Sequence, residues 1–427
     1  MRLIKPYQLH GQMHAVSSKS YLQRALAIAS MAGSISELRN VQWSTDSEAA
    51  LNIAVKLGCS TRQSNENLWI TPGKPAPGEL VFDCRESGLS LRIFSCIAAT
   101  LVRPVKVTGT GTLLKRPLDP LIDILRENGV KVQSEKGKLP MIITGPMTGG
   151  SIFVDGSFSS QIISGLLITL PLLTVDSELE ISNPTSTPYI GMTLGIIEQF
   201  GVDISHEGFK NYRIRGNQQY KGTTYQVESD WSAVSNFLVA AAASGEIIIS
   251  GLNPKSMQGD RAILEILENC GAEISWKDGL LNVRKDKLIS FQFDATHHPD
   301  LFPPLVILAS ACTGSSIIKG TQRLLHKESN RQNALKDLLK ALGGSFTTAG
   351  DELVIHGSGS LQGGKVECHN DHRIAMAAAA AGAIATGDIE INEPGVISKS
   401  YPDFFQDLDS CTIPKPTTDN RQPTTIL

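Results

Sequence analysis

Apolar residues follow a pattern along this chain that repeats six times. Each repeat opens with a short polar segment and continues into a helix that is apolar on nearly all sides. An amphipathic helix and short strands follow. The expected N-caps of the apolar helices, spaced 69–72 residues apart, are Ser18, Ser87, Ser159, Asp230, Asp300 and Asp371. A helix that is apolar all round is buried, so we expect these helices at the centre of the fold.

A second series of residues has the same period. The amphipathic helices end at glycines spaced 70–72 residues apart: Gly58, Gly129, Gly201, Gly271 and Gly343. Glycine is common just after the last helical turn, because it adopts the left-handed conformation at little cost. Together the two series predict six units of about 70 residues.

One such unit buries too little apolar surface to fold alone, so we expect two domains of three units each, dividing near Glu228. The predicted fold class is α/β (α+β), with helices inside and strands outside. In this arrangement the N-termini of several central helices point towards one shared region. The Pro- and Thr-rich residues 411–427 are expected to form a flexible tail.

Composition excludes several classes of protein. The 427 residues carry a net charge of −3, whereas a nucleic-acid-binding protein usually has a basic excess. No apolar stretch approaches the length of a membrane span, and the N-terminus lacks a leader pattern, so we expect a cytoplasmic protein. Seven scattered cysteines without a C-x-x-C pair predict buried free thiols rather than disulfides or a zinc site.

Cations gather at the predicted helix mouths and in the connecting segments. The helix mouths carry Lys19, Arg24, Arg92 and Arg373. The connecting segments add Lys115, Arg116, Lys327, Arg331 and Lys399. Helix N-termini also attract anions, through their partial positive charge and free N–H groups. We therefore expect a basic cleft that binds phosphates and carboxylates.

These residues also have simpler interpretations. The serines can serve only as helix caps, and single lysines and arginines are usually solvated. His369, Asp371 and His372 are possible metal ligands, although their segment lacks an H-E-x-x-H pattern. Asp300 and Glu328, like Asp371, are carboxylates close to cations, where they can relay protons.

Several short motifs occur in an order and spacing that resemble a known family. They are "SSKSYLQRAL", "RPLDPLIDIL", "DGSFSSQ", "STPYIGMTL", "SMQGD", "HPD", "HKESNR", "HNDHR" and "SKSYPDFF". Over nearly its whole length the chain resembles the 5-enolpyruvylshikimate-3-phosphate synthase family of enolpyruvyl transferases. The resemblance implies a two-domain inside-out α/β barrel of six units, with helix N-termini facing the interdomain cleft. It places residues 16–228 in the first domain, and residues 1–15 with 229–410 in the second.

The implied reaction transfers the enolpyruvyl group of phosphoenolpyruvate to the 5-hydroxyl of shikimate 3-phosphate, by addition and then elimination. This step belongs to aromatic amino-acid biosynthesis and requires no metal or organic cofactor. The implied partners are these two small molecules, with no nucleic acid and no membrane, and we expect a monomer.

The resemblance also implies which residues form the site. Those implied for shikimate 3-phosphate are Lys19, Ser20, Arg24, Ser159, Ser160, Gln161, Ser186, Tyr189, Asp300 and Lys327. Those implied for phosphoenolpyruvate are Lys19, Gly88, Arg116, Gln161, Arg331, Arg373 and Lys399. Asp300 corresponds to the proton acceptor at the 5-hydroxyl and Glu328 to the proton donor, and Lys19 and His372 lie beside the reacting centre.

The chain departs from the family pattern at four places. Residues 16–19 read Val-Ser-Ser-Lys where the family has Pro-Gly-Ser-Lys, and residues 86–89 read Glu-Ser-Gly-Leu where it has Asn-Ala-Gly-Thr. Ile93 replaces a proline, and Arg323 replaces an asparagine, so the role of that asparagine is not transferred. Glu86 would repel phosphoenolpyruvate unless it is paired, and Arg92 or Arg85 is its expected partner.

Two other functions remain open from the sequence. One is enolpyruvyl transfer to UDP-N-acetylglucosamine, but that related family carries a loop cysteine that residues 112–115 lack, and Lys-Asn where this chain has Lys19-Ser20. The other is a non-catalytic anion-binding homologue, which only the altered residues 86–89 favour.

Overall fold

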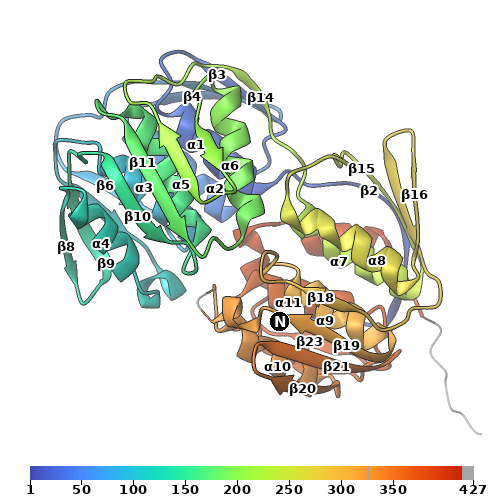
Figure 1. Cartoon of the computed structure of the whole chain (residues 1–427). Helices are drawn as coiled ribbons and strands as arrows, with labels where there is room; N and C mark the ends of the chain where they lie inside the picture. The colour runs from blue at the N-terminus through green and yellow to red at the C-terminus, as the bar shows by residue number, and fades with distance from the viewer. Residues whose placement is uncertain (326, 416–427) are drawn as a thin grey trace, which may run out of the picture.

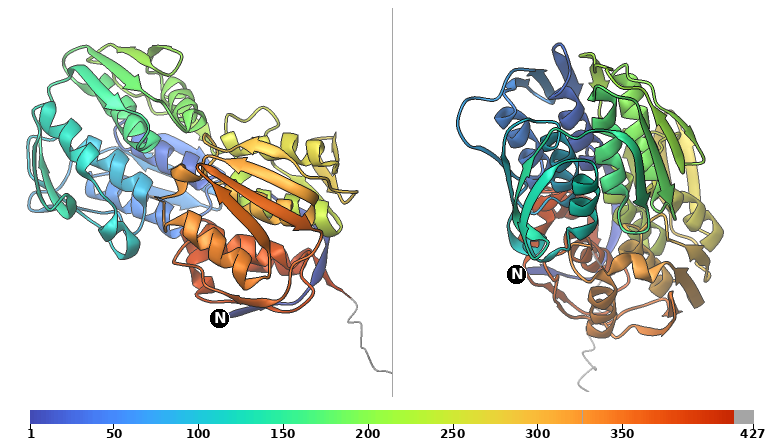
Figure 2. Two further views of the ribbon diagram at one scale, coloured as in Figure 1. Left: turned by 60° about the horizontal axis from the view of Figure 1, so that its bottom comes forward. Right: turned by 60° about the vertical axis from the view of Figure 1, so that its left-hand side comes forward.

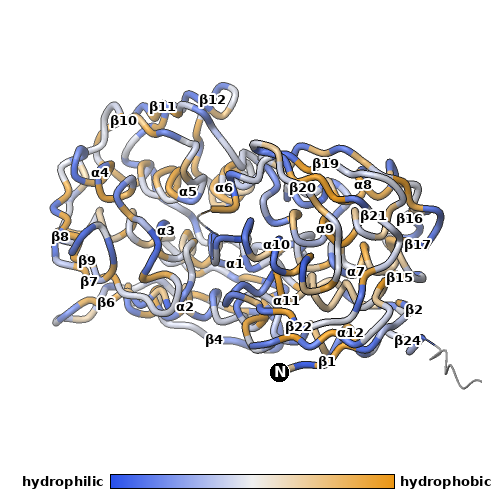
Figure 3. The backbone as a smooth tube through the Cα atoms, turned by 90° about the horizontal axis from the view of Figure 1, so that it is seen from below, coloured by the Kyte–Doolittle hydropathy of each residue, from blue (hydrophilic) through white to orange (hydrophobic). Residues whose placement is uncertain are grey.

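The computed structural model describes residues 1–325 and 327–415, which form two lobes (Figure 1). Each lobe has its own hydrophobic core. The core of the first lobe draws its buried residues from Tyr21 to Val227. The core of the second draws them from Ile4 to Ala15 and from Trp231 to Cys411. Figure 3 shows the two lobes side by side from below.

Six sheets repeat one topology, in which a parallel pair of strands continues into antiparallel strands. In the first lobe the sheets are β14 (Thr224–Gln226), β3 (Ser36–Arg39), β5 (Asn67–Thr71) and β4 (Ser60–Ser64); β6 (Leu80–Asp83), β7 (Val105–Thr108), β9 (Lys138–Thr144) and β8 (Lys131–Glu135); and β10 (Gly150–Asp155), β11 (Ser177–Ser182), β13 (Asn211–Ile214) and β12 (Ser205–Glu207). In the second lobe they are β2 (Tyr7–His14), β15 (Glu246–Ser250), β17 (Leu280–Arg284) and β16 (Glu273–Lys277); β18 (Gln292–Asp294), β19 (Thr313–Lys319), β21 (Glu352–Ser358) and β20 (Ser345–Ala349); and β22 (Gly364–Val366), β23 (Ile389–Ile391) and β1 (Arg2–Ile4). The predicted α/β fold of six units is confirmed.

The helices divide into two kinds, as their apolar patterns predict. The inner helices are α1 (Lys19–Ala29), α3 (Gly88–Ala98), α5 (Ser160–Thr169), α7 (Trp231–Ser244), α9 (Phe302–Ala311) and α11 (His372–Ala381). Every residue of α3, α7 and α11 is buried, and α7, α9 and α11 pack against one another. The amphipathic helices are α2 (Thr45–Lys56), α4 (Asp119–Glu127), α6 (Thr187–Gln199), α8 (Ile263–Cys270), α10 (Arg331–Ala341) and α12 (Phe404–Ser410).

The predicted helix stops are confirmed. Gly58, Gly129, Gly201, Gly271 and Gly343 all have positive φ, between 68° and 101°. A side chain disfavours this backbone conformation, which explains why glycine recurs at each of these positions.

Five of the six predicted N-caps occupy the cap position, and Asp300 is the exception. The N-cap of α9 is Leu301, and the first turn contains Pro303 and Pro304. Proline has no N–H group, so this turn offers few donors to a capping carboxylate. The Asp300 side chain is therefore not consumed by its own helix.

The N-terminal strands and the last described residues both lie on the second lobe (Figure 2). β1 pairs with β23, and β2 runs parallel to β15. β24 (Thr412–Pro414) pairs with β2, and Cys411 is buried. The prediction of a flexible tail from residue 411 is therefore wrong for residues 411–415. Its remainder, residues 416–427, lies outside the described residues.

Two further expectations concern the cysteines and membrane-spanning helices. All seven cysteines are free and buried, as predicted. Within the described part of the chain, no helix has the length and apolar character needed to cross a bilayer.

Candidate active site

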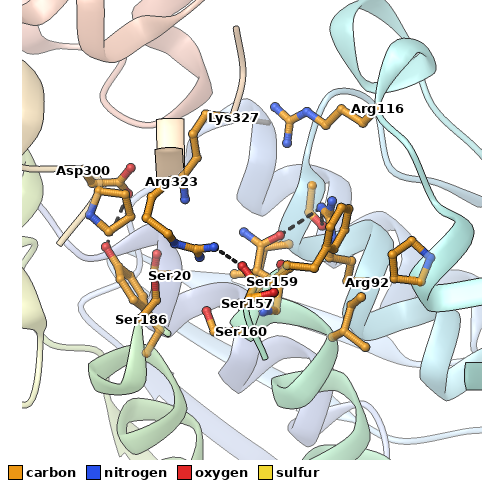
Figure 4. Close-up of a pocket in the computed structure, with 18 of the residues that line it drawn as sticks. Ser20, Arg92, Arg116, Ser157, Ser159, Ser160, Ser186, Asp300, Arg323 and Lys327 are labelled. Carbon is orange, nitrogen blue, oxygen red and sulfur yellow. Dashed lines mark hydrogen bonds between the residues drawn. The ribbon is translucent and has the colours of Figure 1, made fainter. Parts of the chain in front are cut away.

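A cleft of about 570 Å³ lies between the two lobes (Figure 4). The first lobe lines it with the N-terminal ends of α1, α3 and α5. The second lobe contributes Asp300, Lys327, Glu328 and the start of α11. Of the residues expected to bind substrate, all except Arg331 and Lys399 line this cleft. The cleft therefore combines the positive ends of several helices with cations from both lobes.

Arg331 holds three carboxylates together directly behind the cleft surface. Its side chain is fully buried, and its Nε lies 2.9 Å from Asp371 Oδ2. Nη1 lies 2.7 Å from Asp300 Oδ1, and Nη2 lies 2.6 Å from Glu328 Oε2. Burial alone would lower the pKa of Arg331, but the three carboxylates raise it well above its usual value. Arg331 therefore stays charged and fixes the positions of all three acids.

Asp300 lies between two arginines. In addition to Arg331, Arg373 Nη2 lies 2.8 Å from Asp300 Oδ2. Burial would raise the pKa of Asp300, but Arg373 and Arg331 outweigh it and hold the pKa far below its usual range. Asp300 is therefore ionised, as a proton acceptor must be.

Glu328 connects the two lobes. Besides its bond to Arg331, its Oε1 lies 3.8 Å from Arg116 Nη2 of the first lobe. Burial would raise the pKa of Glu328, but Arg331 and Arg116 hold it well below its usual value. In this arrangement Glu328 is ionised, so it holds no proton to donate.

Lys19 and Lys399 form another link between the lobes. Lys19 Nζ donates to Asp46 Oδ2 at 2.9 Å and to the backbone oxygen of Lys399 at 3.3 Å. Lys399 Nζ donates to the backbone oxygen of Asn370 at 2.8 Å and lies 3.2 Å from Glu86 Oε2. Lys399 is thus already engaged, which explains why it lies beside the cleft rather than in its lining.

Glu86 is neutralised by Lys399, not by the nearby arginines that were expected to pair with it. Its Oε2 also accepts hydrogen bonds from Asn370 Nδ2 at 2.8 Å and from the Thr112 N–H at 3.0 Å. Burial opposes these contacts, yet Thr112 and Lys399 lower the pKa of Glu86. The prediction of an Arg85 or Arg92 partner is wrong, because those side chains bind elsewhere.

Arg85 and Arg92 have other partners. Arg85 Nη1 pairs with Glu48 Oε2 at 2.7 Å. Arg92 Nη1 donates to Gln161 Oε1 at 3.0 Å and to the Gly88 backbone oxygen at 3.0 Å. Burial lowers the pKa of Arg92 to about 9. Arg92 therefore orients Gln161, one of the residues expected to contact both substrates.

Gly88 allows two arginines to approach the start of α3. A Cβ atom at this position would lie 2.5 Å from Arg116 Nη1 and 2.9 Å from Arg92 Nη1. Any side chain would displace Arg116 from the cleft. The absence of a side chain at Gly88 thus lets two cations approach the backbone at the start of α3.

Hydroxyl groups gather at the start of α5 and α6. Ser159 caps α5, and Ser160 and Gln161 follow it in the first turn. Ser186 Oγ is buried and has no hydrogen-bond partner among the described residues. Tyr189 OH lies 3.4 Å from Asp300 Oδ2. These donors surround one end of the cleft and suit the oxygens of a phosphorylated ring.

Arg24 and His372 lie deeper than their sequence positions suggest. Arg24 Nε donates to Thr193 Oγ1 at 2.8 Å and Nη1 donates to the Ser20 backbone oxygen at 2.8 Å. Burial, with Lys19 and Arg373, holds the pKa of His372 well below its usual value, so this imidazole is neutral. Asp371 is occupied by Arg331, and His369 lies 3.3 Å from Asp337. These contacts leave the three candidate metal ligands in separate roles.

Sequence reasoning missed several cleft residues. Asp46 was overlooked because an acid in the first turn of a helix usually needs no other explanation. Arg92 was noted as a cation but assigned no ligand. Arg323 was set aside, yet it lines the cleft.

Comparisons with known proteins agree with this geometry. A model of the family described as EPSP synthase (3-phosphoshikimate 1-carboxyvinyltransferase) matches residues 4–408. A 3-phosphoshikimate 1-carboxyvinyltransferase from Methanocorpusculum labreanum is 35% identical over 412 residues, covering 95% of this chain and 97% of that protein. One from Clostridium kluyveri is 37% identical over 414 residues, covering 95% and 96%.

A solved structure shows the same fold. EPSP synthase from Acinetobacter baumannii superimposes with a TM-score of 0.81 at 26% identity, covering 96% of this chain and 97% of that one. Together with the match along nearly the whole chain, this shows that the protein belongs to the EPSP synthase family.

Proposed function

We propose that this protein transfers the enolpyruvyl group of phosphoenolpyruvate to the 5-hydroxyl of shikimate 3-phosphate, releasing phosphate. The observation that carries the proposal is the pair of carboxylates, Asp300 and Glu328, held by Arg331 in a cationic cleft. Addition followed by elimination needs one group that accepts the hydroxyl proton and one that protonates the enol carbon. Both substrates are anions, which the cations and helix N-termini of the cleft suit.

In the first step, Asp300 takes the proton of the 5-hydroxyl and the hydroxyl oxygen bonds to C2 of phosphoenolpyruvate. At the same time, C3 gains a proton from Glu328. In the second step, C3 returns a proton to Glu328, the C2–O bond to phosphate breaks, and phosphate leaves with the proton from Asp300. Glu328 must therefore be protonated before the first step. A bound phosphoenolpyruvate would supply this condition, because its negative charge raises the pKa of a neighbouring carboxyl.

Phosphate release with different acceptors tests the proposal. We expect phosphoenolpyruvate to release phosphate with shikimate 3-phosphate and not with UDP-N-acetylglucosamine. Phosphate release with UDP-N-acetylglucosamine but not with shikimate 3-phosphate would assign the related transferase reaction instead. Absence of release with either acceptor would favour a non-catalytic anion-binding protein.

The oligomeric state and the cellular location belong to the same proposal. The monomer expected from the family resemblance is part of this proposal. The cytoplasmic location expected from the sequence stays a prediction.

A further inference from the structure

Arg323 crosses the cleft from the second lobe to the first (Figure 4). It lies on the short helix η4 (Thr321–Leu324), and its Nη1 donates a hydrogen bond to the backbone oxygen of Ser157. Ser157 belongs to the turn between β10 and α5. The guanidinium of Arg323 is thereby placed beside the serines at the start of α5.

The charge of Arg323 is not matched by an acid. Among residues 1–325 and 327–415, no carboxylate forms an ion pair with it, whereas Arg331 and Arg373 each pair with Asp300. Its Nε is buried and has no hydrogen-bond partner within the same residues. Burial lowers the pKa of Arg323. A half-buried cation without an acidic partner gains from an anionic ligand.

The surroundings of Arg323 are those of a phosphate site. Ser159 and Ser160 lie at the N-terminal end of α5, where backbone N–H groups favour an anion. Ser186 contributes a buried hydroxyl without a partner among the described residues. Lys327 is close enough that the charge of Arg323 helps to lower its pKa. A phosphate between these groups would relieve the repulsion between the two cations.

We propose that Arg323 binds the 3-phosphate of the acceptor and makes this phosphate a requirement for tight binding. The inference rests on the proposed function and adds a specificity-determining residue to it. A guanidinium can bind two phosphate oxygens at once, which a lysine cannot do. Because Arg323 and the serines belong to different lobes, the phosphate also joins the lobes.

Calorimetric titration of Arg323→Ala and Arg323→Lys tests the inference without requiring turnover. We expect Arg323→Ala to bind shikimate 3-phosphate about 10- to 100-fold more weakly than the unchanged protein, with Arg323→Lys in between. The KM for phosphoenolpyruvate should stay within about twofold, because the lost contact belongs to the acceptor. The matched control is Arg215→Ala, which removes an exposed arginine paired with Asp203 far from the cleft lining.

The outcomes separate this inference from the proposed function. If the unchanged protein does not bind shikimate 3-phosphate, the proposed function fails and the inference fails with it. If the unchanged protein binds it and Arg323→Ala binds equally well, only the inference is overturned. A variant that loses affinity for both substrates alike would show a structural role for Arg323 and would also overturn it.

Discussion

The pKa of Asp300 is held low because two arginines pair with its carboxylate. The same pairing makes it a weak base, since basicity falls with pKa. Anionic substrates that attract Arg331 and Arg373 would release part of this stabilisation. The structure thus suggests a base whose strength depends on the presence of substrate.

Replacement of Asp300 by asparagine keeps the size of the side chain and removes the proton acceptor. We expect kcat to fall about 100-fold or more, the usual scale for a general base. The dissociation constant of shikimate 3-phosphate, measured by calorimetry, should change only a few-fold. Asp203→Asn, an exposed acid in the first lobe, is the matched control. An Asp300→Asn enzyme with near-normal kcat would remove Asp300 from this role.

Lys327 predicts a pH dependence. Burial lowers its pKa to about 8, with Asp300 opposing the shift and Arg323 adding to it. Lys327 is charged below this pH and loses its charge above it. We expect kcat/KM for shikimate 3-phosphate to fall as pH rises through about 8. In Lys327→Arg the fall should move to higher pH, because arginine stays charged. A profile that is flat through this range in the unchanged enzyme would contradict the assignment.

The carboxylate of Glu86 forms an ion pair with Lys399 and offsets its charge. Lys399 is expected to bind phosphoenolpyruvate. Glu86→Gln keeps an oxygen for Asn370 and Thr112 but removes that charge. We expect the KM for phosphoenolpyruvate to fall about two- to fivefold, since Lys399 then offers an uncompensated charge to the ligand. Initial rates at low ionic strength would show the effect best. A higher KM would mean that Glu86 helps to hold Lys399 in place for the ligand.

At the scale of whole elements, the helix ends determine both stability and chemistry. The inner helices are buried almost entirely, and the N-terminal residues of α1, α3, α5 and α11 line the cleft. The amphipathic helices α2, α4, α6, α8 and α10 are each followed by a glycine with positive φ, which turns the chain towards the next strand.

A pair of glycine substitutions, one just after α6 and one inside it, tests what glycine contributes at the end of a helix. At Gly201, φ is 80°, so Gly201→Ala should lower the free energy of unfolding by about 1 kcal/mol. Gly195 lies inside the same helix, and a Cβ atom there would meet only Met257 Sδ at 3.8 Å. Gly195→Ala should therefore raise the free energy of unfolding by about 0.5–1 kcal/mol. Urea unfolding measures both, and changes of the same sign would contradict this account.

Features set by neighbouring residues could be predicted from the sequence. The six-fold period, the glycine stops and most caps depend on contacts within a turn or two. Asp300 escaped this reasoning because Pro303 and Pro304 change what its helix start can bind. Asp300 binds Arg331 and Arg373 in place of its own helix, and these arginines are too distant in sequence for a local pattern to show the pairing.

At the scale of the whole molecule, the contacts that could not be predicted join distant parts of the chain. Glu86 and Lys399 are far apart in sequence and meet only when the lobes pack together. The pairing of β24 with β2 likewise links the two ends of the chain. A short Pro- and Thr-rich segment gives no local signal for such a partner.

The two connections between the lobes run side by side. Ser17 and Ser229 form an antiparallel bridge, and Ser18 N–H donates to the Glu228 backbone oxygen at 2.8 Å. Arg92 and Arg116 of the first lobe and Lys327 and Arg373 of the second line the cleft, and like charges repel. Anionic ligands shared by both lobes should therefore draw them together.

Small-angle X-ray scattering with and without shikimate 3-phosphate tests most directly whether both lobes close on a shared anionic ligand. We predict a smaller radius of gyration at saturating ligand, and a weaker change with shikimate, which lacks the phosphate. Scattering profiles that superimpose with and without saturating shikimate 3-phosphate would show that the two lobes do not close on a common set of anions.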